Sequence, residues 1–268
     1  MKPLLKIKDQ TGRDLYLKNK PERIISLVPS ITYSTYSLNL EKEVVGITRF
    51  CKYPKEWKKQ KTIIGGTKDI KIEKIIDLKP DLILTNKEEN TKEIVEQLEK
   101  ITSIYVSDVK DIETNNTFLK NLGIITKKVN EAEKINTEIK QLIVKNQNII
   151  SKTFKTLYFI WREPWMVAGT DTYINEMMRL NGFQNIINQK RYPVIDLKKI
   201  QNNSPEIIFL SSEPYPFKEK HRQELKSYFP NTKIILVDGE PFTWFGSYTV
   251  QGLTYLQKLY KNIKTDAY

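Results

Sequence analysis

Short apolar runs alternate along this chain with segments whose apolar residues recur at helical spacing. The runs are four to six residues long, as expected for buried strands. We predict strands at residues 23–28, 44–48, 81–85, 103–106, 156–160, 206–210 and 233–237. We predict helices near residues 70–78, 88–100, 171–181, 196–203, 217–228 and 248–263. This alternation predicts an α/β fold with parallel sheets covered by helices. Residues 5–18 are predicted to add an edge hairpin around a Thr-Gly turn.

The chain also contains an internal repeat at a constant offset of 125. Residues 72–89 read IEKIIDLKPDLILTNKEE, and residues 197–214 read LKKIQNNSPEIIFLSSEP. The offset pairs Pro80 with Pro205 and Glu88 with Glu213. Two similar α/β units predict two Rossmann-like lobes with a ligand cleft between them.

The segment between the repeats has a different pattern. Its apolar residues form one helical stripe, and no Gly or Pro occurs from Ile124 to Glu163. We predict one long, stiff helix of about 24 residues, roughly 36 Å in length. The predicted organisation is an N-terminal lobe at 1–126, a connecting helix at 127–153 and a C-terminal lobe at 154–268. Together they form one binding-protein-like domain from about residue 22.

Composition narrows the possible environments. With 39% hydrophobic residues, the 268-residue chain can bury a core. It has no continuous apolar run of about 18 residues, the length that a membrane-spanning helix needs. Its first residues, MKPLLKIKDQTGRDLYL, lack the apolar core of a secretory signal. We therefore expect a cytoplasmic protein, unless a signal has been removed.

Charge and metal-binding residue types exclude several functions. One cysteine and one histidine rule out an internal disulfide and a multi-His or Cys-rich metal site within the chain. The net charge of +12 comes from 37 Lys and only 7 Arg, spread along the whole length. Nucleic-acid readers favour Arg, so we interpret the Lys surplus as a solvated surface. Attraction of an acidic ligand or membrane surface remains an alternative.

Aromatic side chains gather in the loops that follow the predicted strands, where ligands of open parallel sheets bind. Three of the four Trp lie in these loops, which suggests a rim for a large, flat ligand. The candidates are Phe50, Trp161, Trp165, Tyr215, Trp244 and Phe245. The alternative is that these rings fill the core of their own lobe.

Arg49 and Arg162 follow strands at matching places in the two units and are candidates to pair with ligand carboxylates or amides. The alternative for both is an ordinary ion pair, with Glu163, Asp238 or Glu240 as partner. Cys51 could ligate a metal centre of the ligand or act as a small buried hydrophobe. We expect a structural or solvated role for His221. No nucleophile elbow, phosphate loop or dinucleotide fingerprint is present, so we predict no enzyme.

Several long motifs then resemble a known family. They are RIISLVPSIT, VVGITRFCKYP with GGTKDIKIEKIIDLKPDLIL, IWREPWMVAGTDTYINEM, SSEPYPFKEKH and VDGEPFTWFGS. The chain resembles the cobalamin/iron-siderophore type of ABC-transporter substrate-binding proteins, in the cobalamin-binding-protein-like branch of the helical backbone metal receptors. The resemblance implies two α/β lobes on one backbone helix and no intrinsic cofactor. It implies capture of a cobalamin or another metal chelate at positions Phe50, Trp161, Trp165, Tyr192, Trp244 and Phe245.

The resemblance also implies docking on a permease through one Glu on each lobe. Glu73 matches that position in the first unit, but its counterpart in the second is Lys198, which an Arg pocket would repel. Our leading hypothesis is a monomeric, non-catalytic solute-binding protein for ABC-type uptake that binds no nucleic acid. The alternative is a cytoplasmic corrinoid or metal-chelate sensor or carrier that no longer docks on a permease.

Overall fold

The computed structural model describes residues 5–265, which form two compact units. Unit 1 comprises Met1–Glu138 with Phe245–Tyr248, and unit 2 comprises Ile139–Trp244 with Thr249–Tyr268. Each unit has its own mainly parallel sheet. Among the described residues, no helix is both long and apolar enough to cross a membrane.

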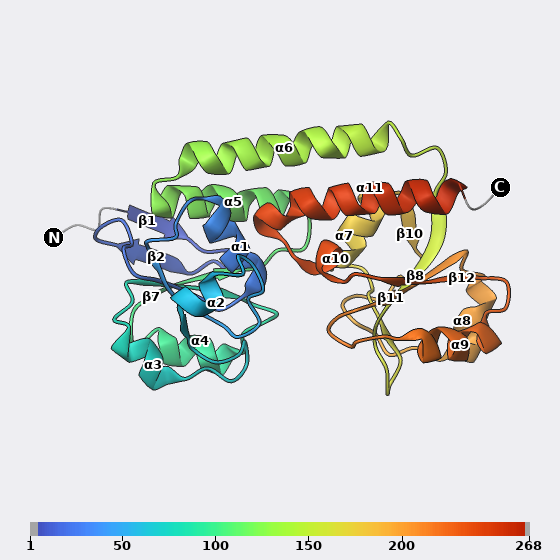
Figure 1. Cartoon of the computed structure of the whole chain (residues 1–268), viewed down its shortest axis with the longest axis horizontal. Coiled ribbons are helices and arrows are strands. Elements are labelled where there is room, and N and C mark those ends of the chain that lie inside the picture. Colours follow the sequence, from blue (N-terminus) through green and yellow to red (C-terminus); the bar gives the residue numbers. More distant parts are fainter. Residues whose placement is uncertain (1–4, 266–268) are drawn as a thin grey trace. The chain divides into compact units, whose positions relative to one another are not determined.

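Unit 1 is built on a five-stranded parallel sheet in the order β5-β4-β3-β6-β7. Its strands are β3 (Ile24–Ser26), β4 (Val44–Ile47), β5 (Thr62–Ile63), β6 (Leu82–Asn86) and β7 (Ser103–Ser107). The central strands β3 and β6 are buried at every residue, as continuous apolar runs covered on both faces should be. Helix α4 (Lys92–Leu98) covers one face and α5 (Ile112–Thr126) the other (Figure 1). The unit also contains α1 (Pro29–Ser37), α2 (Trp57–Gln60) and α3 (Ile72–Asp77).

The predicted hairpin is present as β1 (Leu5–Lys8) and β2 (Asp14–Leu17), paired antiparallel. Gly12 in its turn has φ of +88°, which glycine adopts without strain. The buried carboxylate of Asp9 organises the turn: Oδ1 accepts hydrogen bonds from the Thr11 and Arg13 amides, both at 2.9 Å. Its Oδ2 accepts from the Arg13 guanidinium at 2.8 Å and 3.0 Å.

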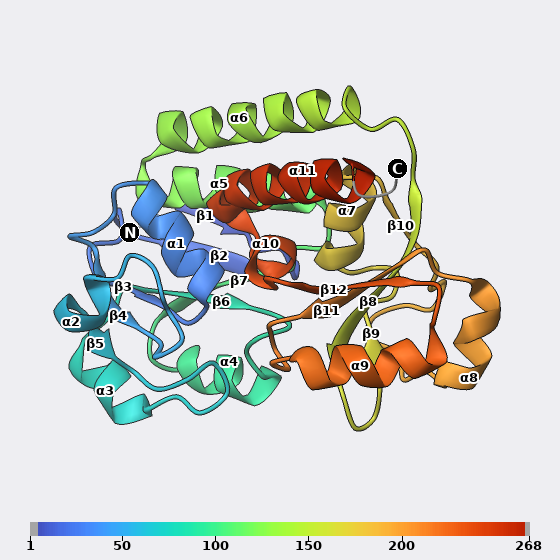
Figure 2. The same cartoon turned by 45° about the vertical axis from the view of Figure 1, so that its right-hand side comes forward.

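Unit 2 has a sheet in the order β10-β8-β11-β12, all parallel, with β9 paired antiparallel to β8. Its strands are β8 (Phe154–Trp161), β9 (Met166–Val167), β10 (Phe183–Asn185), β11 (Ile207–Ser211) and β12 (Lys233–Val237). Helices α7 (Tyr173–Leu180) and α11 (Thr249–Thr265) lie on one face and α9 (Glu219–Tyr228) on the other (Figure 2). Shorter helical segments are α8 (Leu197–Ile200), η1 (Gln201–Asn203), α10 (Glu240–Thr243) and η2 (Gly246–Tyr248), the last within unit 1.

The connecting helix is α6 (Val129–Gln147), whose 19 residues begin in unit 1 and end in unit 2. It is shorter than the predicted helix of about 24 residues. The sequence analysis missed α5, which ends at Thr126. The next residue, Lys127, has left-handed backbone at φ of +58° and separates α5 from α6. The α/β class with two parallel sheets and a long connecting helix is confirmed, and β9 is an antiparallel addition that we did not predict.

Candidate functional site

The exposed ring of Trp161 marks the carboxyl edge of the unit 2 sheet. Trp161 is the last residue of β8 and its side chain is 41% exposed. Tyr215 follows β11, the parallel neighbour of β8, so the two rings emerge at the same edge. They meet edge to face, with centroids 5.6 Å apart. This pair presents an aromatic surface to solvent on a fixed support.

An aromatic layer of the buried Phe159 and Phe217 and the partly buried Trp165 supports that pair. The Trp165 ring stacks on Phe217 at 6.1 Å and meets Phe159 edge to face at 5.3 Å. Tyr215 contacts the same Phe217 ring at 4.8 Å. Trp165 and Tyr215 both pack against the hydrophobic core of unit 2. Trp165 therefore supports the rim more than it forms it, because its indole is held between core rings.

Arg162 packs against this aromatic layer. Its guanidinium lies over the Trp165 ring, 5.3 Å from the centroid. It donates to both carboxylate oxygens of Glu224 on α9, at 2.9 Å and 3.1 Å, and also pairs with Glu163. The hydrogen bonds that Arg162 donates to Glu224 raise the pKa of Arg162 above its ordinary value. Arg162 thus forms ion pairs, as in the alternative given in the sequence analysis. Glu163 is one of the partners named there, whereas Glu224 was not named.

His221 holds Tyr215 from below. The imidazole is 3% exposed and lies edge-on to Phe217 at 5.5 Å. Its Nε2 is 3.2 Å from the Tyr215 hydroxyl, and its Nδ1 accepts the Lys218 backbone N–H at 2.9 Å. These contacts are those of a structural residue, the role that we expected for His221. The signal in the sequence is the spacing Lys218-x-x-His221 at the start of α9, which puts a side-chain acceptor beside an otherwise unpaired helix N–H.

A polar chain runs through the neighbouring loop of unit 2. The buried Tyr158 hydroxyl donates to Ser211 Oγ at 2.9 Å, and Ser211 Oγ donates to the Glu213 carbonyl at 2.6 Å. Thr243 Oγ1 donates to the Glu213 carboxylate at 3.0 Å. Burial raises the pKa of Tyr158 far above its usual range. These bonds fix the start of the loop that carries Tyr215.

The other aromatic candidates occupy different surroundings. Trp244 and Phe245 are only 7% and 6% exposed, and Phe245 packs edge to face on Phe118 within unit 1 at 5.3 Å. Their burial corresponds to the core-filling alternative. Tyr192 is half-buried, and the Arg191 guanidinium lies 5.4 Å from the centroid of its ring. The segment that carries Tyr192 pairs with β9, because the Val167 N–H donates to the Pro193 carbonyl.

In unit 1 the loop after β4 presents Arg49 and Phe50 at the carboxyl edge. Both are exposed, and the Arg49 guanidinium lies 4.9 Å from the Phe50 ring centroid. Arg49 Nη2 pairs with Asp69 Oδ2 at 2.8 Å. A Cβ on Gly66 would lie 2.1 Å from Asp69 Oδ1, 2.9 Å from the Phe50 ring and 3.1 Å from Arg49 Nη2, so a larger residue there would displace these side chains.

Cys51, the next residue, lies inside unit 1 with 1% exposure. Its thiol is 3.1 Å from Thr32 Oγ1 and 3.3 Å from Thr48 Oγ1, and burial raises its pKa. These surroundings match the buried-hydrophobe alternative. In the described part of the chain, no three His, Cys, Asp or Glu residues lie together as metal ligands would.

A group of tyrosines in unit 1 was missed by the sequence analysis. Tyr33 and Tyr36 lie one turn apart on α1, with ring centroids 6.4 Å apart. Tyr33 also meets Tyr248 edge to face, with ring centroids 5.1 Å apart. Burial raises the pKa of Tyr33, and the nearby Tyr36 and Tyr53 hydroxyls raise it to a smaller extent. The i, i+3 spacing of Tyr in SITYSTYS was the available signal.

The two predicted docking positions lie on short helices. Glu73 is an exposed residue in the first turn of α3. Lys198 is exposed on α8, where its backbone N–H donates to the N-capping carboxylate of Asp196 at 2.9 Å. The Asp196 carboxylate thus caps α8. At the two predicted docking positions, α3 carries the acidic Glu73 and α8 carries the basic Lys198.

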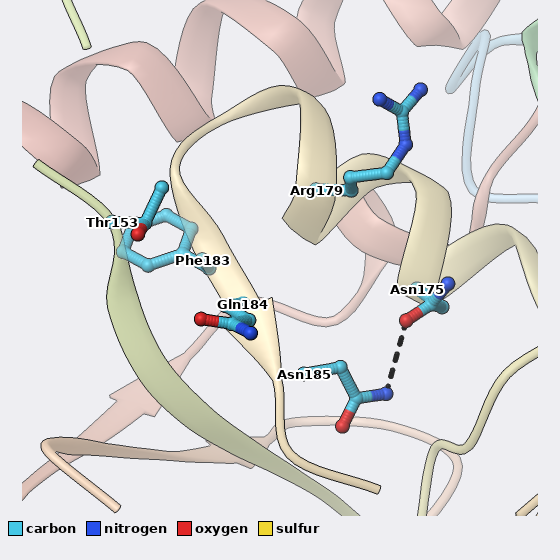
Figure 3. Close-up of a pocket in the computed structure, with 6 residues that line it drawn as sticks. All are labelled: Thr153, Asn175, Arg179, Phe183, Gln184 and Asn185. Atoms are coloured by element: carbon cyan, nitrogen blue, oxygen red, sulfur yellow. Dashed lines mark hydrogen bonds between the residues drawn. The ribbon is translucent and has the colours of Figure 1, made fainter. Parts of the chain in front are cut away.

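A hollow of about 330 Å³ lies elsewhere on unit 2, beside the short strand β10 (Figure 3). Its lining residues are Thr153, Asn175, Arg179, Phe183, Gln184 and Asn185. Thr153 precedes β8, so the hollow lies near the strand's amino end, about 23 Å along β8 from Trp161. Arg179 there is paired with Glu176, and Asn185 donates to Asn175. The hollow is separate from the aromatic rim.

Comparison with known proteins identifies the family. The family model described as periplasmic binding protein matches residues 24–229. The chain belongs to the periplasmic binding protein family. The expectation of a binding protein without an intrinsic cofactor, rather than an enzyme, is confirmed by that membership.

Individual relatives of this periplasmic binding protein agree with that assignment. It is 30% identical over 218 residues to an uncharacterised ABC transporter substrate-binding lipoprotein of Bacillus subtilis, covering 77% of this chain and 67% of that protein. It is 25% identical over 203 residues to the vitamin B12-binding protein of Pectobacterium carotovorum, with 72% of each chain covered.

Solved structures establish the fold. A possible iron-binding, periplasmic solute-binding protein of Staphylococcus epidermidis superposes with a TM-score of 0.78 at 24% identity, covering 90% of this chain and 98% of that one. The periplasmic vitamin B12 binding protein of Vibrio cholerae gives a TM-score of 0.76 at 20% identity, covering 91% and 98%.

Proposed function

We propose that this solute-binding protein captures a corrinoid or a related metal chelate and delivers it to an ABC permease. The observation that carries the proposal is the exposed Trp161–Tyr215 pair, held by an aromatic layer at the carboxyl edge of unit 2. A broad, partly apolar macrocycle or chelate is the kind of ligand that such a surface stacks on. Relatives named as vitamin B12-binding proteins support the same ligand class.

We propose candidate ligand-contacting residues in each unit, taken separately. In unit 2 the contacting residues are Trp161, Tyr215 and Tyr192, with Trp165 and Arg162 as support. In unit 1 they are Arg49 and Phe50, both exposed after β4. Trp244 and Phe245, although predicted as rim residues, act through packing in this proposal because they are buried.

A titration panel tests the ligand class. Cyanocobalamin, haem and the ferric complex of acinetobactin are titrated by tryptophan fluorescence quenching and by calorimetry. Trp57 is buried, 1% exposed, in unit 1. Trp57→Phe should therefore retain most of the quenching, and Trp161→Phe should lose a larger share of it. Binding of none of the three compounds by the wild-type chain would reject the ligand proposal.

Docking is tested separately through the charges on α3 and α8. We propose that Glu73 contacts the permease, as the family resemblance implies. If the permease presents basic pockets to both units, Lys198→Glu should strengthen its binding. If it presents an acidic group opposite α8, Lys198→Glu should weaken it. If neither Lys198→Glu nor Glu73→Gln changes binding to a reconstituted permease, the docking proposal fails and the sensor or carrier alternative gains support.

We propose that the protein works outside the cytoplasm, in keeping with the family's description. This differs from the cytoplasmic expectation in the sequence analysis. Fractionation of cells that produce the native protein decides the point, and recovery with cytoplasmic markers would refute it.

A further inference from the structure

The hydrogen bonds around His221 define its protonation state. A backbone N–H can only donate, so the 2.9 Å contact from Lys218 N requires an unprotonated Nδ1. A neutral imidazole then carries its proton on Nε2. The 3.2 Å contact between Nε2 and Tyr215 Oη is therefore a hydrogen bond that His221 donates and Tyr215 accepts.

This direction leaves the Tyr215 hydroxyl hydrogen uncommitted. Within the described residues, the Tyr215 hydroxyl has His221 as its only hydrogen-bond partner. Its oxygen is occupied, whereas its O–H can donate to a further group. The ring contacts Phe217 at a centroid distance of 4.8 Å and the exposed Trp161 ring at 5.6 Å. The free hydrogen thus belongs to a ring of the candidate binding surface.

We propose that His221 is a positioning residue that orients Tyr215 as a hydrogen-bond donor, so that this surface selects chelates carrying an oxygen acceptor at their edge. Amide carbonyl, carboxylate and phenolate oxygens all meet that requirement. The inference rests on the proposed ligand-binding function and adds to it that Tyr215 donates a hydrogen bond to the ligand.

Acid disrupts the arrangement. A protonated imidazole keeps its Nε2–H but gains an Nδ1–H, which opposes the Lys218 N–H, so the ring loses the contact that holds Nε2 beside Tyr215. Burial, together with the cations Lys220, Arg162 and Lys218, lowers the pKa of His221, and Glu224 opposes that effect. Chelate affinity should therefore be constant at neutral pH and decline only below the ordinary histidine range near pH 6.5.

The tautomer is measurable without a ligand because His221 is the only histidine in the chain. Long-range proton–nitrogen NMR spectra of the wild-type protein at pH 7.5 should show one neutral imidazole with its proton on Nε2. A proton on Nδ1 would overturn the inference. This readout stands whether or not any chelate binds.

The second arm uses cyanocobalamin, or haem or ferric acinetobactin if one of those binds instead. Tyr215→Phe should weaken binding about tenfold, the usual effect of losing one hydrogen bond. His221→Gln places an amide donor near the Nε2 position and should retain more affinity than His221→Asn, whose amide is too short to reach Tyr215. The decline of affinity in acid should be absent from both His221 variants.

Each result of this arm has a defined meaning. Unchanged affinity in Tyr215→Phe, or an acid decline that persists in His221→Asn, would overturn the inference while the proposed function stands. Binding of no compound by the wild type would instead reject the proposed function, and the NMR result would still decide whether His221 donates to Tyr215.

Discussion

Trp161 and Trp165 lie four residues apart, yet the structure assigns them opposite roles, and truncation should separate those roles. Trp161 is 41% exposed and its contact with Tyr215 is edge to face. Such an aromatic contact contributes about 0.5–1.5 kcal/mol beyond burial. This contact should therefore account for at most about 1.5 kcal/mol of the unfolding free energy lost in Trp161→Ala, and the total loss should be smaller than that in Trp165→Ala.

Trp165 should behave in the opposite way. Its indole contacts Phe159 and Phe217, lies under Arg162 and packs on the unit 2 core. Truncation of a buried Trp to Ala typically costs 3–5 kcal/mol, and the half-buried Trp165 belongs near the lower end, at about 3 kcal/mol. For ligand binding the order reverses: Trp161→Ala should weaken cyanocobalamin binding by about 2 kcal/mol, or about thirtyfold.

Urea unfolding followed by circular dichroism measures the first quantity, and calorimetric titration of the folded variants measures the second. Trp161→Phe is the matched control, because it keeps an aromatic ring at the rim. If Trp161→Ala lost about 3 kcal/mol of stability and Trp165→Ala lost little, the division into rim and support would be wrong. The same conclusion would follow if both variants bound cyanocobalamin as the wild type does.

Three further predictions concern unit 1. Burial disfavours an ionised Asp9, but hydrogen bonds from Arg13 and Thr11 outweigh it and lower its pKa. The stability from Asp9 is therefore present above its ordinary pKa near 3.9 and lost as the pH falls through the lower folded pKa. Asp9→Asn should cost about 2 kcal/mol at pH 7, and a loss that is equal at pH 2 and pH 7 in denaturant titrations would contradict this.

Gly246 has φ of +76°, and a Cβ there would lie 2.1 Å from Ser34 Oγ, whereas Gly12 at φ of +88° has nothing within 4 Å of its Cβ position. Gly246→Ala should thus destabilise by several kcal/mol and Gly12→Ala by about 1 kcal/mol, and equal denaturation midpoints would refute the steric argument. Cys51 should react with Ellman's reagent only after unfolding, because its buried thiol has a raised pKa; rapid reaction of the native protein would show that it is accessible.

Local sequence patterns predicted those elements whose burial alone determines their sequence. The apolar runs of β6 and β11 were identified almost to the residue, because strands covered on both faces are continuously apolar. The helix α5 was missed although Asp111 caps it, accepting from Thr114 N–H at 2.8 Å. Its end depends on the left-handed conformation of Lys127, and Lys gives no signal for that conformation.

The candidate site was harder to predict, since an aromatic residue in a loop can point to solvent or fold onto the core. Trp161 and Trp165 occur in the same motif, but only the fold shows that β8 extends to Trp161 and that β9 turns Trp165 back onto Phe217. The role of His221 was likewise hidden. Its two partners are local in sequence, but their donor and acceptor directions appear only when the loop after β11 is folded.

The two arginines show how the repeated units can have diverged in function. Arg49 and Asp69 form an exposed pair, with side chains 50% and 60% accessible, and such pairs contribute at most about 1 kcal/mol. Arg49 can therefore exchange Asp69 for an acidic or amide group of a ligand at little cost. Arg162 is 23% accessible and gives two hydrogen bonds to Glu224 while covering Trp165. Removing it from Glu224 would free a carboxylate and uncover an indole, so Arg162 is the more firmly held of the two arginines.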